Sequence, residues 1–414
     1  MKRSARTTTV AAGLALGLAL AGCGSDSEEG TASSATGAAN SKPTGTPIKL
    51  FTIQQITVTN QDATDEAADA LKASVARINA EGGILGRPVE VEVCDDKFSP
   101  ATAAECARKA SSGDYAAVVG AVTQQGDAIY PVLEAAGMCN VGPNAINRLD
   151  YSSKASFPIV ASGPANVAGY AYALKAVGST NIGIAYVDIP TAAGTTSFVE
   201  LGAKNAGGLK VNQKVPIPLT TTDISAVVAS TLRGNDGVAL VVAPAQLASF
   251  ARSLGQSGSK VYAAASAADP KLIDQLGPAA ERLVIAAAFA PVTGDAEGVK
   301  RFNADMDKTA PKAERNAFAI NAWLAAQVLK QAIEQAKPAT VDKTSVCAAM
   351  NSAKDVDMFG VLPKWSGAET VKIPGLNRLL SPYTQVQKVE NGKLVVVDGK
   401  WVNALDPTAT VPAV

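Results

Sequence analysis

The sequence contains no histidine, and this absence removes several kinds of chemistry at once. Without an imidazole the chain has no Ser-His-Asp or Cys-His nucleophile pair, no histidine metal ligand and no histidine general base. None of its five cysteines is spaced as C-x-x-C, which argues against a zinc ribbon or a thioredoxin-type redox site. The formal net charge is zero, so the chain lacks the basic excess that nucleic-acid-binding proteins use.

Motifs for phosphate and nucleotide binding are also missing. We find no G-x-x-x-x-G-K-[ST], no G-x-S-x-G and no G-x-G-x-x-G after a strand. The segment 257–260 fits S-x-x-K, but no S-D-N or K-T-G motif accompanies it, and we interpret it as a solvated loop. We therefore expect no enzymatic activity, no cofactor and no nucleic-acid partner.

What the chain does have is apolar material for a large core. Its 414 residues are 47% hydrophobic and 18% charged, which fits two or three globular domains and excludes global disorder. From residue 47 onward, strand-like and helix-like segments alternate, a pattern typical of an α/β fold with two doubly wound parallel-sheet lobes. The segments expected to be strands are 48–53, 89–93, 115–122, 139–141, 182–187, 238–243, 261–264 and 283–288, with a short strand-like run at 393–397. Helices are expected at 62–79, 100–112, 124–136, 294–309 and 314–336.

The amino terminus has the features of an export signal. Lys2, Arg3 and Arg6 precede an uncharged run of 13 residues, 10–22, which is too short to span a membrane. The run ends in Leu-Ala-Gly-Cys at 20–23, a string that resembles the lipobox of bacterial lipoproteins. The resemblance implies that residues 1–22 are a signal peptide and that a lipidated Cys23 anchors the mature chain to the cell membrane, outside the cytoplasm. The alternative is an ordinary signal peptide with a chance cysteine. Residues 23–46, rich in Gly, Ser, Thr and Ala, are expected to be a flexible tether.

The body resembles the leucine/isoleucine/valine-binding family, the type I periplasmic solute-binding proteins of ABC importers. The most specific likeness is Arg-Ile-Asn-Ala-Glu-Gly-Gly-Ile-Leu-Gly-Arg-Pro-Val at 77–89, followed by Cys-Asp-Asp at 94–96. Weaker likenesses lie at 119–125, 135–145, 316–319 and 388–393, so the resemblance covers roughly residues 47–400.

The resemblance implies two lobes joined by a multi-strand hinge, with a small-molecule ligand in the cleft between them. We place lobe one at residues 47–160 plus 291–354 and lobe two at 161–290 plus 355–414. The implied partners are ABC importer permease subunits, and we expect a monomer that captures its ligand by hinge closure without covalent chemistry. Two alternatives use the same fold: a ligand-sensing receptor subunit that signals to a regulator, or a lipoprotein scaffold without a transport role.

Relatives hold the ligand with loops at the carboxyl ends of lobe-one strands. The residues at the matching positions of this chain are candidates for ligand binding, and they could also be ordinary helix caps. Phe318 falls where the family has an aromatic residue near the hinge, although it could equally be core, and lobe two contributes Ala192 and Ala265. The lobe-one candidates are Gln54, Gln55, Thr57, Thr123, Gln124, Gln125, Asn144, Ala145 and Ile146.

Lobe two lacks, at the matching segment, the acidic side chain with which amino-acid binders of this family hold the ligand's ammonium. The matching segment, 262–268, contains no carboxylate, although Asp188 or Asp269 could substitute. The lobe-two tyrosines of relatives are replaced by segments 190–193 and 243–246. Because a buried ammonium needs a charge partner, we expect the ligand not to be a free branched-chain amino acid, but a carboxylate or a mostly apolar metabolite.

Two further expectations concern strand two and the cysteines. The pair Asp95-Asp96 could bind a hard cation, but acidic residues at a strand end more often cap the following turn, which we prefer. Relatives carry a disulfide in this region, and export implies an oxidising compartment. We therefore expect a bridge between Cys94 and Cys106, and the sequence leaves open whether Cys139 and Cys347 form a second.

Overall fold

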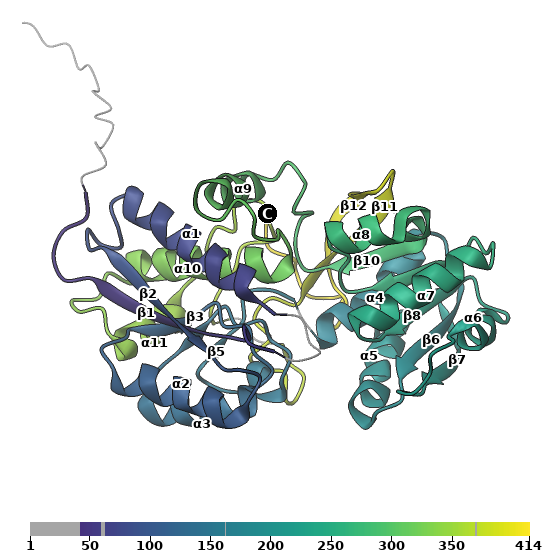
Figure 1. The fold of residues 1–414 in the computed structure, drawn as a ribbon, viewed down its shortest axis with the longest axis horizontal. Coiled ribbons are helices and arrows are strands. Elements are labelled where there is room, and N and C mark those ends of the chain that lie inside the picture. Colours follow the sequence, from purple (N-terminus) through teal and green to yellow (C-terminus); the bar gives the residue numbers. More distant parts are fainter. Residues whose placement is uncertain (1–41, 59–62, 162, 369–370) are drawn as a thin grey trace, which may run out of the picture. The chain divides into compact units, whose positions relative to one another are not determined.

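The computed structural model describes residues 42–58, 63–161, 163–368 and 371–414, so Cys23 and the predicted signal peptide lie outside the described residues. The chain forms two sheets flanked by helices (Figure 1). Among the described residues, no helix has the length and apolar character needed to cross a membrane. The first sheet has five parallel strands in the order β2-β1-β3-β4-β5. Their bounds are β1 Ile48–Gln54, β2 Val89–Asp95, β3 Ala117–Val119, β4 Asn140–Val141 and β5 Ser156–Phe157.

Alternation along β1 determines how helices cover the first sheet. Leu50 faces a cluster with α1 (Asp65–Ala80) and α10 (Ala317–Ala336), while Phe51 faces α2 (Pro100–Ser112) and α3 (Gly126–Ala136) on the other side. Both faces are therefore buried, as a parallel sheet requires. The strand β2, with alternating glutamates, is at the sheet edge as its sequence predicts. The remaining elements of this region are α9 Glu297–Thr309, α11 Lys343–Ser352 and the 3₁₀ turn η1 Arg148–Tyr151.

The second sheet has seven strands in the order β12-β11-β10-β9-β8-β6-β7, and it is not purely parallel. β11 pairs antiparallel with β10, and β12 pairs antiparallel with β11. The expectation of a parallel sheet is thus correct for five strands and wrong for the carboxy-terminal hairpin, whose tight Asn391-Gly392 turn joins neighbours directly. The bounds are β6 Asn181–Val187, β7 Lys210–Ile217, β8 Gly237–Val241, β9 Tyr262–Ala265, β10 Leu283–Ala287, β11 Tyr383–Glu390 and β12 Lys393–Asn403.

Helices also cover both faces of the second sheet. One cluster packs Ile184 and Ala239 against α4 (Pro164–Ala176) and α5 (Pro190–Ala206). The opposite cluster packs Leu240 and Ile285 against the other helices of this lobe. Those helices are α6 Ser225–Leu232, α7 Pro244–Gln256, α8 Pro270–Leu276 and the 3₁₀ segment η2 Gly277–Arg282.

Residues 356–368 and 371–380, which we expected in lobe two, pack instead with the first sheet. Val356, Leu362 and Leu379 belong to the same cluster as Leu50 of β1. The Arg378 guanidinium lies 4.2 Å from the centre of the Phe157 ring, and its Nε donates to the Ser156 carbonyl at 2.9 Å. The segment thereby covers the outer side of the edge strand β5, whose backbone groups would otherwise lack partners. We propose to move the lobe boundary from residue 355 to about residue 381 for this reason.

The structure contains two disulfides, and the first of them confirms the expected Cys94–Cys106 bridge. Cys94 at the end of β2 is bonded to Cys106 in α2. Cys139, immediately before β4, is bonded to Cys347 in α11 across 208 positions of sequence. The first bridge joins β2 to α2 and the second joins the residue before β4 to α11, so both cross-links lie within one lobe.

A buried carboxylate joins three helices of the first lobe. Asp305 on α9 is 5% exposed and accepts hydrogen bonds from the Arg77 guanidinium of α1 and from Trp323 Nε1 of α10. We expect Asp305→Ala to lower the free energy of unfolding by about 3 kcal/mol, because the half-buried Arg77 guanidinium keeps only its contact with Glu81 and the buried indole N–H loses its partner. Urea unfolding followed by circular dichroism measures this loss.

The matched control is Glu297→Ala on the same helix, whose carboxylate pairs with Arg301 at the exposed surface. That substitution should cost no more than about 1 kcal/mol. Equal losses for the two variants would contradict the role assigned to Asp305.

Candidate functional site

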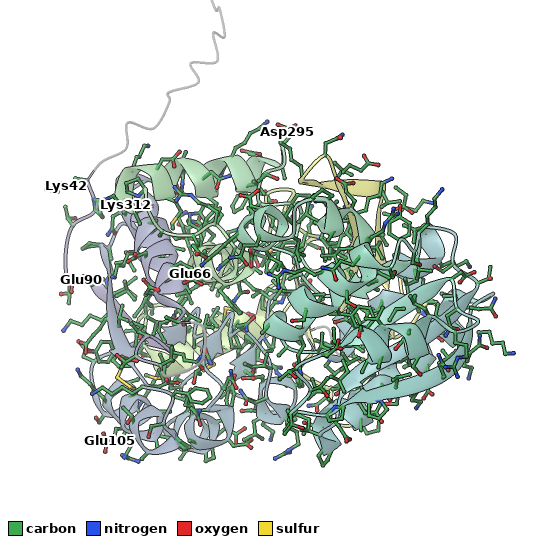
Figure 2. All side chains as sticks on the ribbon, turned by 45° about the vertical axis from the view of Figure 1, so that its right-hand side comes forward. Lys42, Glu66, Glu90, Glu105, Asp295 and Lys312 are labelled. Atoms are coloured by element: carbon green, nitrogen blue, oxygen red, sulfur yellow. A yellow bond between two sulfur atoms is a disulfide. The ribbon has the colours of Figure 1, made fainter. Side chains whose placement is uncertain are left out.

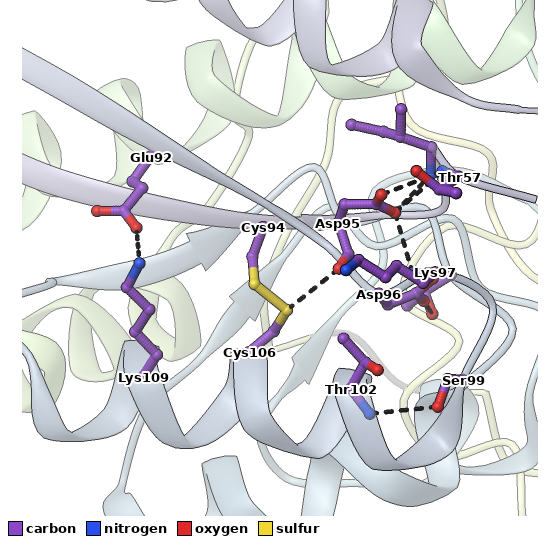
Figure 3. Close-up of a disulfide and its surroundings, with 12 residues drawn as sticks. Thr57, Glu92, Cys94, Asp95, Asp96, Lys97, Ser99, Thr102, Cys106 and Lys109 are labelled. Carbon is purple, nitrogen blue, oxygen red and sulfur yellow. Dashed lines mark hydrogen bonds and ion pairs between the residues drawn. A yellow bond between two sulfur atoms is a disulfide. The ribbon is translucent and has the colours of Figure 1, made fainter.

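The acidic pair at the end of β2 organises the neighbouring loops (Figure 3). Asp95 accepts the backbone N–H groups of Ile56, Thr57 and Lys97 at 3.0–3.2 Å. Burial would raise the pKa of Asp95, but these hydrogen bonds outweigh burial and lower it. The bonds support the capping interpretation of the acidic pair. No group of three or more potential metal ligands is found among the described residues.

Asp96 points the other way, into the protein. Its carboxylate is fully buried, accepts the Phe98 N–H at 2.8 Å and accepts the hydroxyl of Thr123. Burial raises the pKa of Asp96, against the hydrogen bonds that favour the ionised form. The pair therefore links the ends of β1, β2 and β3, the first-sheet edge at which ligands bind in open α/β sheets.

The candidate residues after β1 mostly form hydrogen bonds within the protein itself. Gln54 is buried, and its Nε2 donates to the Gly120 carbonyl at 2.8 Å and to Thr52 Oγ1 at 2.7 Å. Gln55 is also buried, and its backbone N–H donates to the Val122 carbonyl. Thr57 is exposed and held by Asp95 through its backbone.

In the loop after β3, one side chain is hydrogen-bonded within the protein and two are not bonded to other described residues. Thr123 donates its hydroxyl to Asp96, while its oxygen accepts the Gln125 N–H at 3.0 Å. Gln124 is exposed and Gln125 half-buried at the start of α3. Neither side-chain amide forms a hydrogen bond with another described residue, so both remain available to a ligand.

The loop after β4 is shaped by a second buried carboxylate. Asp150, 4% exposed, accepts the N–H of Ile146 at 2.9 Å and that of Asn147 at 2.6 Å. Burial raises its pKa, opposed by these hydrogen bonds. Asn144 is half-buried with a free side-chain amide in the described structure, Ala145 is buried in the core, and Ile146 is 48% exposed. Of these candidates, Ala145 has no surface to offer because its methyl group packs inside the first lobe.

Phe318 begins α10 beside a buried acid that sequence reasoning missed. Phe318 is half-buried and packs against the first-lobe core. Asn316, the N-cap of α10, donates from Nδ2 to Glu66 Oε1 at 3.0 Å. Figure 2 shows Glu66 set among the helices, whereas Glu90 and Glu105 lie at the outer surface. Burial raises the pKa of Glu66, against the Asn316 hydrogen bond.

The second sheet presents small side chains at its carboxyl edge. Ala192 is half-buried in the first turn of α5, whereas Ala265 is 4% exposed and packs in the core of the second sheet. The next two residues, Ser266 and Ala267, are exposed. Asp269 is the N-cap of α8 and accepts the Leu272 N–H at 2.7 Å, so its carboxylate is already used within the protein. Asp188 is exposed, and its carboxylate forms no hydrogen bond or ion pair with the described residues, although its backbone N–H donates to the Ile217 carbonyl.

Two surface hollows lie away from all these candidates. One, of about 410 Å³, lies between α8, η2 and the turn at 391–392, and the other, of about 370 Å³, lies between α1 and the segment 309–313. Neither is lined by a predicted ligand residue. A cleft that closes only around its ligand is open in the free protein, so an enclosed cavity is not required there.

Sequence reasoning also missed the pair Asn147 and Asp150. The Asn147 side chain donates to the Thr123 carbonyl at 3.3 Å and to Asp150 at 3.0 Å, which joins the loops after β3 and β4. An asparagine followed three residues later by an acid is a capping-box pattern, and it opens η1 here. That spacing was the available signal, although it does not identify Thr123 as a partner.

A family model described as "Periplasmic binding protein" matches residues 49–388. No match is found among curated proteins.

Solved structures share the fold at low sequence identity. An extracellular ligand-binding receptor from Verminephrobacter eiseniae is 17% identical with a TM-score of 0.71, over 84% of this chain and 100% of that one. A fatty acid ABC transporter substrate-binding protein from Thermomonospora curvata is 21% identical with a TM-score of 0.70, over 90% and 96% of the two chains. A leucine-binding protein from Thermotoga maritima is 20% identical with a TM-score of 0.64, over 84% and 97%.

Proposed function

The chain belongs to the periplasmic binding protein family, and from this premise we propose that it is an extracytoplasmic solute-binding protein that delivers a small molecule to an ABC importer. The observation that carries the proposal is the set of loops at the carboxyl edge of the first sheet. There, Asp95 and Asp96 bring together residues from the ends of three strands, where ligands bind in open α/β sheets. The role is binding without covalent chemistry.

The charges of the candidate cleft argue against a free branched-chain amino acid. In lobe two, Asp269 is used as a helix cap, and the segment 263–268 consists of alanines and one serine. Exposed Ile146 and Ile189 follow β4 and β6, one in each lobe, and add apolar surface. An ammonium group buried there would lack the charge partner that its desolvation requires. A mostly apolar ligand, such as the fatty acid named for the Thermomonospora curvata protein, fits this surface better.

We predict that isothermal titration calorimetry detects no binding of leucine, isoleucine or valine, and detects binding of a member of a panel of fatty acids and aromatic carboxylates. The physical reason is the missing charge partner, which costs an ammonium several kcal/mol. Asp188→Asn is the matched control, because Asp188 is the free lobe-two carboxylate that could substitute. Leucine binding at micromolar concentration that Asp188→Asn abolishes would overturn the ligand class and assign the ammonium to Asp188.

Ligand capture is proposed to proceed by rotation of lobe two onto a ligand held by lobe one. The chain passes between the two sheets after β5, after β10 and before β11, so three segments act as the hinge. We expect small-angle scattering to show a smaller radius of gyration at saturation with the panel compound that binds. A panel compound without calorimetric heat is the control, and an unchanged scattering profile at saturation would contradict hinge closure.

The proposal includes lipidation of Cys23 and anchoring at the cell membrane. We predict that the wild-type protein sediments with the membrane fraction of a producing bacterium and that Cys23→Ser is released from it, since one thiol carries the attachment. The other four cysteines of the chain are all paired in the two disulfides. Equal membrane recovery of the two proteins would show that Cys23 is not the anchor.

A further inference from the structure

The three candidate loops of lobe one are connected by a continuous set of polar contacts, which we name the loop clamp. Asp95 holds the loop after β1, and the adjacent Asp96 accepts the hydroxyl of Thr123 after β3. Asn147 then donates to the Thr123 carbonyl, and Asp150 holds the loop after β4. The loop clamp consists of Thr57, Asp95, Asp96, Thr123, Asn147 and Asp150.

The two inner carboxylates of the loop clamp are buried without a cation. Asp96 is 0% exposed and Asp150 is 4% exposed, and neither forms an ion pair within the described residues. Their compensation comes from N–H and O–H donors of the surrounding loops, together with Tyr130, which lies close to Asp150. Burying an unpaired carboxylate is costly, so its donors must be held in place for the fold to be stable. The carboxylates therefore fix the loops as much as the loops satisfy the carboxylates.

The lobe-one candidates fall into two groups, according to whether their side-chain hydrogen-bond donors are already used within the protein. The Thr123 hydroxyl has one proton, which it gives to Asp96, and its oxygen already accepts the Gln125 N–H. Both Nε2 protons of Gln54 are likewise used, toward Thr52 and Gly120. Gln124, Gln125 and Asn144 keep free side-chain amides within the described structure.

We propose that Asp96 and Asp150 are positioning residues that hold the three loops as one rigid half-site, on which Gln124, Gln125 and Asn144 make the polar ligand contacts. In this assignment, which rests on the proposed function, Thr123 acts inside the loop clamp and Gln54 is bonded to Thr52 and Gly120, and neither contacts the ligand. A half-site that is rigid before binding avoids the entropic cost of ordering three loops around the ligand.

Hydrogen exchange of the full chain, with both disulfides intact and without ligand, tests the loop clamp directly. The reporters are the amides of Ile56, Phe98, Gln125 and Ile146, each of which donates to a side chain of the loop clamp. Thr123→Val removes the hydroxyl at nearly constant volume. We expect exchange to become about tenfold faster at Phe98 and Gln125 and also faster at Ile146, which lies three contacts away.

Two variants control for size and for simple loss of a bond. Thr123→Ser keeps the hydroxyl and should restore slow exchange at all the reporters. Asp236→Asn alters a carboxylate that accepts the Thr180 and Asn181 N–H groups at 2.8–3.0 Å, at the amino end of the second sheet. It should speed exchange at those two amides and leave the four reporters unchanged.

If Thr123→Val does not fold, Asn147→Ala is measured in its place. The Asn147 side chain is half-buried, and when it is removed Asp150 still accepts the backbone N–H groups of residues 146 and 147. Acceleration confined to Gln125, or spread equally over the whole chain, would overturn the loop clamp. The measurement involves no ligand, so a failure of the ligand panel bears on the proposed function and on the ligand contacts, and not on the rigidity of the loop clamp.

Discussion

Parallel strands covered by helices on both faces must end in loops, and the first N–H groups of those loops find no partners within the sheet. In the first lobe this requirement is met by carboxylates, since Asp95 takes three such groups and Asp150 takes two. The same edge is where an open α/β sheet can receive a ligand. The geometry of the candidate site therefore depends on how the polar groups of the loops are satisfied. The Cys94–Cys106 bridge fixes the strand end that carries the acidic pair.

Close packing against α10 explains why the strands of this lobe end where they do. Gly120 and Gly142 have φ values of +61° and +64° and lie against Ala322 and Ala325, so that a Cβ atom at Gly142 would come within 2.4 Å of a methyl group. These glycines let β3 and β4 turn sharply beside the helix and place Thr123 and Asn144 at the sheet edge. Small residues in α10 and positive-φ glycines after the strands thus act together.

Much of this fold was predictable from local pattern, and the exceptions have physical reasons. The predicted helix 100–112 is α2, whose Ser99 cap and Pro100 define its start. β7 was missed because its lysines and Pro216 hide an edge strand of alternating exposure. β11 was missed because Thr384, Gln385 and Gln387 are buried polar residues, and Gln387 is satisfied by a carbonyl 98 positions away. The pair Asp398-Gly399, a dipeptide typical of turns, lies inside β12, at an irregularity of its pairing with β11.

The site was predictable as a set of loops, but not in the roles of its residues. The pattern places Thr123, Gln124 and Gln125 in one loop, yet only the fold reveals that Asp96, 27 residues earlier, uses the Thr123 hydroxyl. The same holds in lobe two, where Asp269 could substitute for a missing acid by sequence and is withdrawn from that role by capping α8. A polar side chain is available to a ligand only when the fold leaves its donors and acceptors unused. Long-range pairing decides this, and for that reason composition and spacing identify the edge of the sheet but do not identify the contacts.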